Sequence, residues 1–166
     1  AKARVQGAID GLNQVIRDLR AYILDLKPRQ MGEGGLIVGI QRLVVEFKAH
    51  TFVDVNLVHP EKGLKNLPET HSLALFHICQ ETLANAAKHA KAKNVNISMW
   101  ETKDRALMEI RDDGIGFDME KMRAAIGHGL ANMHTRVQSV GGDVEITSHI
   151  NDGTTVLAWV PRHARA

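Results

Sequence analysis

Four polar side chains between residues 80 and 90 have the types and spacing to bind a metal ion and phosphate. The segment reads QETLANAAKHA, with Glu81, Asn85 and Lys88 at helical spacings and His89 directly after them. This spacing puts the first three on roughly one helix face. An asparagine oxygen can ligate Mg²⁺, a glutamate can hold one of its waters, and a lysine can neutralise phosphate charge. An ordinary solvated face of an alanine-rich helix explains the segment equally well.

A second candidate is the segment DDGIGFD, which directly follows a predicted strand. Gly114 and Gly116 permit a tight turn and the close approach of a ligand. Asp112, at the strand end, can accept a hydrogen bond from an exocyclic amine such as that of adenine, and without such a partner a buried carboxylate is costly. The alternative is a simple strand-ending turn, because Asp-Asp-Gly is common turn chemistry.

Two further glycine motifs follow. In GHGLANM, Gly127 and Gly129 precede a predicted helix, whose first turn exposes backbone N–H groups that can bind an anion. A flexible helix start is the alternative. Gly153-Thr154 closes a predicted hairpin, and a hairpin turn alone is sufficient to explain it.

Composition and missing motifs narrow the classes of function. The 166 residues carry a net charge of +2, which is too balanced to indicate a nucleic-acid surface. Cys79 is the single cysteine, so an internal disulfide and a cysteine-only metal site are excluded. The sequence has no phosphate-loop motif of the Walker type, no HRD or DFG set and no HExxH. No apolar run is long enough to span a bilayer, and no signal segment is evident.

Periodicity predicts how these motifs are positioned. The order is helix, strand, long helix, two strands, helix and two strands, which favours an α/β two-layer sandwich with a mixed sheet and the helices on one face. Asn151-Asp152-Gly153 is a strong hairpin signal. Helices are expected from residue 36 to 47, 69 to 90 and 130 to 140, and strands at 51–58, 94–100, 107–112, 143–150 and 154–161.

The first 28 residues carry a separate pattern. Apolar residues alternate steps of four and three over three heptads, which favours a bundle or a dimer over a helix packed on its own domain. We expect residues 1–28 to form one long helix, residues 29–35 a hinge, and residues 36–163 a separate domain. Pro28 should end the helix. The seam residues are Val5, Ile9, Leu12, Ile16, Leu19, Ile23 and Leu26.

Taken together and in this order, the motifs resemble the nucleotide-binding fold shared by histidine kinases, gyrase-type ATPases, HSP90 and MutL. Within that superfamily the chain looks most like sensor histidine kinases that act on response regulators of the nitrate-response type. The segments that carry the resemblance are LRAYILDLKP, LALFHICQETLANAAKHA and GHGLANMHTRV. Only residues 117–126 separate the two glycine boxes, which implies a short lid.

The resemblance implies a role for each candidate residue, with ATP and Mg²⁺ as the ligands. Asn85 would ligate Mg²⁺, and Glu81 would orient a metal-bound water or assist proton transfer. The phosphates would lie near Lys88 and His89. Adenine would be recognised by Asp112 and lined by Thr154, with Gly114 and Gly116 shaping the pocket, and the lid would be ordered by Gly127, Gly129 and Leu130.

The implied function is the catalytic part of a two-component kinase that acts in a homodimer. The resemblance implies that residues 1–28 are the second helix of the dimerisation hairpin and that residues 36–163 are the catalytic ATP-binding domain. The γ-phosphate would go to a histidine on a dimerisation helix that this chain lacks, for relay to a response regulator. Two alternatives are a non-catalytic nucleotide-binding dimer module and a serine-directed kinase of the anti-sigma type. We expect no nucleic-acid partner and no membrane contact. The expected location is cytoplasmic, with membrane anchoring of the parent protein left open.

Overall fold

The computed structural model describes residues 1–26, 30–62, 64, 66–125 and 128–164. A single five-stranded sheet organises these residues, with strand order β1-β2-β3-β5-β4. The β1–β2 pair is parallel, whereas β2–β3, β3–β5 and β4–β5 are antiparallel. The predicted mixed sheet is therefore confirmed. The strands are β1 Asp54–Val58, β2 Asn94–Glu101, β3 Arg105–Asp112, β4 Asp143–Ser148 and β5 Thr154–Pro161.

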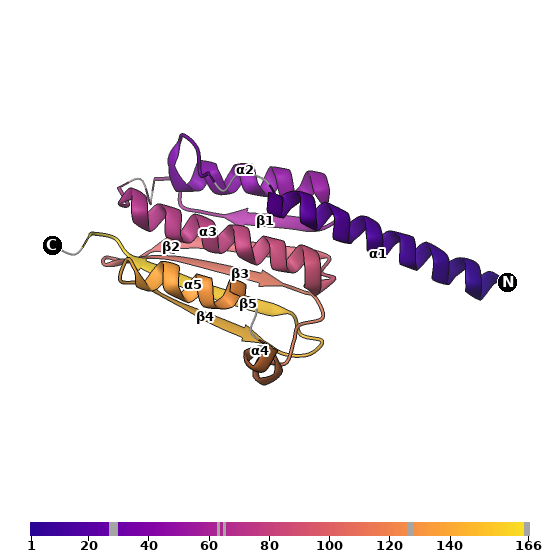
Figure 1. Ribbon diagram of the computed structural model, residues 1–166. Coiled ribbons are helices and arrows are strands. Elements are labelled where there is room, and N and C mark those ends of the chain that lie inside the picture. Colours follow the sequence, from indigo (N-terminus) through magenta and orange to yellow (C-terminus); the bar gives the residue numbers. More distant parts are fainter. Residues whose placement is uncertain (27–29, 63, 65, 126–127, 165–166) are drawn as a thin grey trace.

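Three helices cover one face of the sheet and form the second layer (Figure 1). They are α2 Gly35–His50, α3 Glu69–Asn85 and α5 His128–Gln138, and α3 continues directly into a π-helical turn, η1 Ala86–Ala90. The predicted α/β two-layer sandwich is confirmed. The segment after β3, expected to be a link, contains a further short helix, α4 Met119–Ala125.

Alternation along the central strands builds the core between the two layers. Val95, Ile97 and Met99 of β2 are buried while their neighbours are not, as the period of two requires. They pack in one apolar cluster with helix residues such as Phe47 and Phe76. This cluster fixes the long helix α3 across the sheet, so that its end lies beside the ends of β3 and β5.

The first strand begins later than its apolar pattern suggested. β1 starts at Asp54, and Phe52 is outside it with 83% of its surface exposed. The guanidinium carbon of Arg20 lies 4.6 Å from the centre of the Phe52 ring. Phe52 therefore contacts Arg20 of the N-terminal helix, α1 Lys2–Leu26, instead of entering the sheet.

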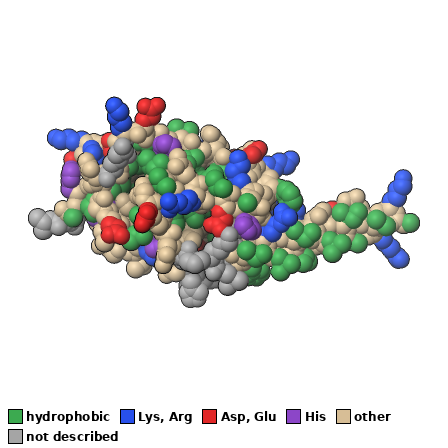
Figure 2. Space-filling view, turned by 90° about the horizontal axis from the view of Figure 1, so that it is seen from above, with side chains coloured by type: hydrophobic (Ala, Val, Ile, Leu, Met, Phe, Trp, Pro, Cys, Tyr) green, Lys and Arg blue, Asp and Glu red, His purple; other side chains and the backbone are tan. Residues whose placement is uncertain are grey.

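Helix α1, Lys2–Leu26, projects from the body of the molecule (Figure 1). Its heptad seam is exposed along most of its length; Leu12, for example, is 64% exposed. Hydrophobic side chains lie along the projecting helix in Figure 2. The expected helix end at Pro28 lies outside the described residues. None of the described helices combines the length and the apolarity that a bilayer crossing requires.

Candidate functional site

A cavity of about 360 Å³ lies where α3, η1 and α5 meet the ends of β3, β4 and β5. It brings together six of the predicted site residues, which come from four separate parts of the sequence. Those six are Asn85, His89, Asp112, Gly116, Leu130 and Thr154. The remaining wall is made by Thr82, Ala86, Ala90, Ile115, Phe117, Met122, Met133, Ile146 and Val156.

The π-helical turn decides which side chains of the long helix reach the cavity. Asn85 is the last residue of α3, and η1 begins immediately after it. Because π-helical bonding runs from i to i+5, residues four and five positions after Asn85 return to its face. These residues are His89 and Ala90, and both line the cavity.

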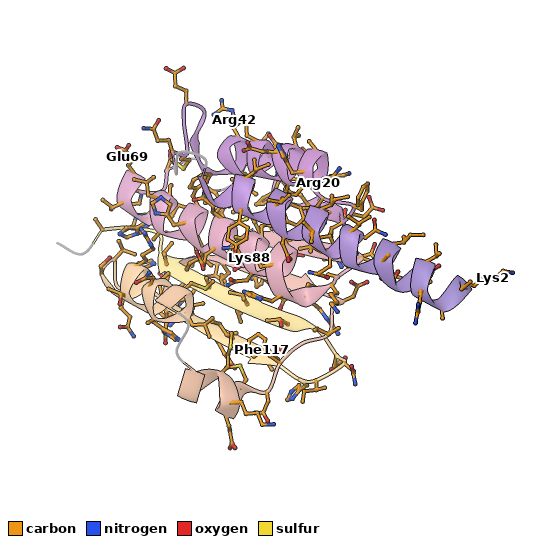
Figure 3. All side chains as sticks on the ribbon, turned by 45° about the vertical axis from the view of Figure 1, so that its right-hand side comes forward. Lys2, Arg20, Arg42, Glu69, Lys88 and Phe117 are labelled. Atoms are coloured by element: carbon orange, nitrogen blue, oxygen red, sulfur yellow. The ribbon has the colours of Figure 1, made fainter. Side chains whose placement is uncertain are left out.

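Lys88, expected on the face of Asn85 from α-helical spacing, points elsewhere. Its Nζ lies 5.8 Å from the centre of the Tyr22 ring on α1, and Figure 3 shows it beneath that helix. Partial burial lowers the pKa of the Lys88 ammonium. The structure therefore does not bring Lys88 to the cavity wall together with Asn85 and His89.

Asp112 supplies a buried carboxylate at the end of β3. Only 6% of the residue is exposed. The backbone N–H of Gly114 donates to Asp112 Oδ1 at 2.9 Å, and the backbone of Thr154 also hydrogen-bonds to this carboxylate. Burial raises the pKa of Asp112, and these two hydrogen bonds only partly oppose the effect. The group is thus a buried hydrogen-bond acceptor on the wall of the cavity.

The neighbouring Asp113 faces away from the cavity and has a structural role. Its Oδ1 accepts hydrogen bonds from the backbone N–H groups of Lys93 and Asn94, at 2.8 and 2.9 Å. Its Oδ2 accepts from Asn94 Nδ2 at 2.8 Å. The side-chain bond from Asn94, followed by the backbone bonds, lowers the pKa of Asp113. The two adjacent carboxylates thus have opposite environments.

Two glycines are needed where the turn after β3 passes other backbone. A Cβ atom at Gly114 would collide with the carbonyl group of Ala90. Gly116 has a φ of +60°, and a Cβ atom there would collide with the carbonyl oxygen of His149. The turn is therefore held against both η1 and the β4–β5 hairpin, so the close approach at these two glycines is to other backbone, whereas the sequence argument had expected a ligand there.

Glu81 and Gly129 lie against each other beside the cavity. Gly129 is in the first turn of α5, and a Cβ atom there would collide with Glu81 Oε1. Leu130, the next residue, lines the cavity. Gly127 lies outside the described residues. The start of α5 and the carboxylate of Glu81 are consequently close neighbours at one side of the site.

Ser148 connects the lid, the hairpin and the cavity wall, and sequence reasoning missed it. Its hydroxyl accepts a hydrogen bond from the Phe117 backbone N–H at 2.9 Å and donates to the Gly153 carbonyl at 3.0 Å. Thr154 Oγ1 lies 2.8 Å from Ser148 Oγ. The sequence does contain one signal for Ser148, which lies just before the Asn151-Asp152-Gly153 turn. A hairpin at this turn brings it opposite Thr154, as the structure shows. Phe117 starts the segment that leads to α4 (Figure 3).

The site offers few protein ligands to a metal ion. Among the described residues, no group of three or more His, Cys, Asp or Glu side chains is placed to hold one. Magnesium in nucleotide sites is usually held by one or two protein oxygens together with phosphate oxygens and water. Asn85 on the cavity wall fits that second arrangement.

Comparison with known families identifies the fold and its class. Residues 70–164 match the family described as histidine kinase-, DNA gyrase B-, and HSP90-like ATPase. The chain belongs to this family. It therefore carries the type of ATPase domain found in sensor histidine kinases, as its motifs predicted.

Individual relatives agree with this assignment. The chain is 35% identical over 146 residues to the signal transduction histidine-protein kinase/phosphatase DegS of Brevibacillus brevis, covering 88% of this chain and 37% of DegS. It is 30% identical over 166 residues to the sensor histidine kinase MctS of Rhizobium johnstonii, covering 99% of this chain and 36% of MctS. The chain thus spans less than half the length of these curated relatives.

A solved structure supports the fold. The histidine kinase domain of a blue-light activated kinase from Erythrobacter litoralis aligns with a TM-score of 0.66 at 17% identity. The alignment covers 96% of this chain and 82% of that domain. At this level of identity the similarity concerns the fold alone.

Proposed function

We propose that this chain binds Mg-ATP and is the catalytic ATP-binding part of a two-component sensor histidine kinase. The observation that carries the proposal is the cavity that unites Asn85, His89, Asp112 and Thr154. These residues belong to the helix, strand and hairpin motifs that the family resemblance singled out. Their meeting in one cavity is what a shared ligand requires.

The inner end of the cavity suits an adenine ring. Asp112 is a hydrogen-bond acceptor there, and an exocyclic amine is a matching donor. Met133, Ile146 and Val156 line the same cavity with apolar surface, against which a planar base can pack. Selectivity for adenine over guanine follows, because guanine presents a carbonyl where adenine presents its amine.

The outer end suits the phosphates and the metal. Asn85 is half-buried and His89 is exposed, so a ligand held by Asp112 at its base would leave the cavity past these two residues. Bound Mg²⁺ would neutralise charge on the phosphates. We propose Asn85 as its protein ligand, with Glu81 orienting a metal-bound water. Lys88 would have to leave the Tyr22 ring before it could approach the phosphates.

The proposed reaction is phosphoryl transfer. The bond between the γ-phosphorus and the bridging oxygen breaks, a bond forms from phosphorus to a histidine nitrogen, and ADP leaves. In such reactions positioning and charge stabilisation supply most of the catalysis. The backbone N–H groups in the first turn of α5 are suited to stabilise the γ-phosphate.

The acceptor histidine is proposed to lie on a dimerisation helix outside this chain. The exposed seam of α1, which includes Leu12 and Leu19, supports this proposal because such a stripe needs a helix to cover it. We accordingly propose residues 1–28 as a dimerisation helix, 29–35 as a hinge and 36–163 as the catalytic domain. The parent protein would act as a homodimer, and its partner would be a response regulator of the nitrate-response type.

Calorimetry on an Asn85→Ala variant tests the proposal. The unmodified chain should bind Mg-ATP. Asn85→Ala should lower the affinity at least about tenfold, because it removes an oxygen ligand for the metal while deleting no core volume. Circular dichroism should show an unchanged fold. Asn13→Ala removes an exposed helical asparagine from α1 and serves as the matched control with unchanged affinity. Equal Mg-ATP affinity in Asn85→Ala and the unmodified chain would contradict the proposal.

A further inference from the structure

Thr82 presents a buried hydroxyl to the cavity that the proposed chemistry has not used. It lies one helical turn before Asn85, lines the cavity and is only 6% exposed. Among the residues that the structure describes, none provides a hydrogen-bond partner for Thr82 Oγ1. Leaving a buried hydroxyl unpaired costs free energy, so this arrangement calls for a ligand.

A helical threonine usually has a local solution to this problem. Its hydroxyl can donate to the carbonyl four residues earlier, and Thr135 of α5 does so by bonding to Ala131 at 3.0 Å. Thr51, at the end of α2, bonds to the Phe47 carbonyl at 2.9 Å in the same way. Thr82 makes no such bond within the described part of the chain.

The other hydroxyl on the cavity wall, that of Thr154, already has a hydrogen-bond partner in Ser148. The single proton of Ser148 points to the Gly153 carbonyl. Either oxygen could donate in the 2.8 Å contact between Ser148 and Thr154, and a Ser148 hydroxyl that donates to Gly153 leaves Thr154 as the donor there. With Thr154 as the donor to Ser148, Thr82 is the hydroxyl on the described cavity wall whose proton has no acceptor.

Thr82 and Asp112 line the same cavity and are equally buried, and on this ground we place both at the base end of the proposed ligand. Asp112 is as buried as Thr82, whereas Asn85 is half-buried and His89 exposed. A 6-aminopurine presents a donor, its amine, next to an acceptor, the adjacent ring nitrogen. Asp112 provides an acceptor and Thr82 a donor, so the two side chains complement these neighbouring positions.

We propose that Thr82 is a specificity-determining residue whose hydroxyl donates to the ring nitrogen adjacent to the exocyclic amine of the bound purine. This inference rests on the proposed nucleotide function and extends it to a residue that no motif marks. The hydroxyl and the Asp112 carboxylate together read two adjacent atoms of one base edge. A site that hydrogen-bonds its ligand in this way discriminates against analogues that lack the matching group.

The test combines isosteric protein variants with a matched ligand analogue. Thr82→Val replaces the hydroxyl by a methyl group, and Thr82→Ser keeps the hydroxyl. Calorimetry would compare Mg-ATP with Mg-1-deaza-ATP, in which a C–H group replaces the ring nitrogen in question. We expect Thr82→Val to weaken ATP binding about three- to tenfold, Thr82→Ser to stay within about twofold, and binding of the deaza analogue to be insensitive to Thr82→Val.

Two controls separate a ligand contact from a structural role. Thr135→Val removes an exposed helical hydroxyl outside the cavity wall and should leave ATP affinity unchanged. The thermal midpoint of ligand-free Thr82→Val should equal or exceed that of the unmodified chain, because the variant removes an unpaired buried hydroxyl. A ligand-free midpoint well below that of the unmodified chain would indicate a structural hydroxyl and overturn the inference.

The binding results distinguish this inference from the proposed function. Normal ATP binding by the unmodified chain together with unchanged binding by Thr82→Val overturns the role of Thr82 alone. An equal loss of ATP and deaza-ATP affinity also overturns it, because the ring nitrogen is then not what the hydroxyl contacts. If the unmodified chain fails to bind Mg-ATP, the proposed function and this inference both fail.

Discussion

Two adjacent aspartates at the end of β3 have opposite pKa shifts because their environments differ. Asp112 faces inward, and burial raises its pKa. Asp113 faces outward, and hydrogen bonds led by the Asn94 side chain lower its pKa. The motif alone predicted that Asp112 would be the binding group. It could not reveal that Asp113 ties this turn to the start of β2, because that contact joins residues about twenty positions apart.

Asp112→Asn should reduce the preference of the chain for ATP over GTP by about tenfold or more. The substitution puts an amide where the base amine needs an acceptor, so adenine loses its complement. Competition of unlabelled ATP and GTP against a fluorescent nucleotide would measure the preference. Equal binding of ATP and GTP by the unmodified chain would show that Asp112 does not read the base.

The same residue predicts a pH dependence. The ionised carboxylate of Asp112 has only acceptor oxygens for the exocyclic amine of adenine, whereas the protonated acid carries a proton of its own. Adenine recognition should therefore fail as pH falls through the pKa of Asp112. Because burial raises that pKa above 3.8, the loss should begin at a higher pH than for an ordinary aspartate. Asp112→Asn is the control, and its weaker binding should lack this transition.

At the scale of elements, Asp113 joins two strands at the edge of the site. Asp113→Ala should lower the free energy of unfolding by about 1 kcal/mol, since three hydrogen bonds at an exposed position are lost. Asp113→Asn keeps an acceptor for the two backbone N–H groups and should cost less. Urea unfolding would measure both. A fully stable Asp113→Ala variant would show that these bonds only replace equivalent bonds to water.

The sign of the accompanying pH effect follows from the lowered pKa. The folded state favours the ionised form of Asp113 more than the unfolded state does. Its contribution to stability is therefore present above the unfolded pKa and is lost as pH falls through the lowered folded pKa. Asp113→Ala should be correspondingly less sensitive to acid in that range.

Periodicity predicted most elements, and its failures have physical causes. The alternation of Val95, Ile97 and Met99 located β2 because one face of that strand is buried. Phe52 continued an apolar pattern but packs with Arg20 of α1, a contact that no local pattern contains. The π-turn η1 reads as ordinary helix in sequence. It redirected Lys88 away from Asn85, so spacing alone misassigned that face.

At the scale of the whole molecule, the sequence could identify the motifs but not how the segments face one another. Asn85, Asp112 and Thr154 were predicted as site residues because each belongs to a recognisable motif, and the structure places all three on the wall of one cavity. Thr82 and Ser148 were not predicted, because the role proposed for Thr82 and the hydrogen bonds of Ser148 depend on which hydroxyls are already paired in the folded chain. The heptad pattern predicted α1 well, since an exposed seam depends only on local spacing.

The seam of α1 and the cavity together predict how phosphoryl transfer depends on a second helix. The chain alone should bind ATP but form no stable phosphohistidine, because transfer requires an acceptor nitrogen held in line with the γ-phosphate. A separately supplied dimerisation helix that carries a histidine should dock on the seam and acquire an acid-labile phosphate. Leu12→Lys, at an exposed seam position, should reduce that transfer roughly tenfold or more without changing ATP affinity, since it removes apolar surface from the helix contact. Incubation with γ-labelled ATP followed by peptide mapping would locate the label, and a helix with its histidine replaced is the control. An acid-labile label on any of the nine histidines of this chain would place the acceptor inside it and refute the proposed division of roles between α1, the ATP-binding domain and a separate acceptor helix.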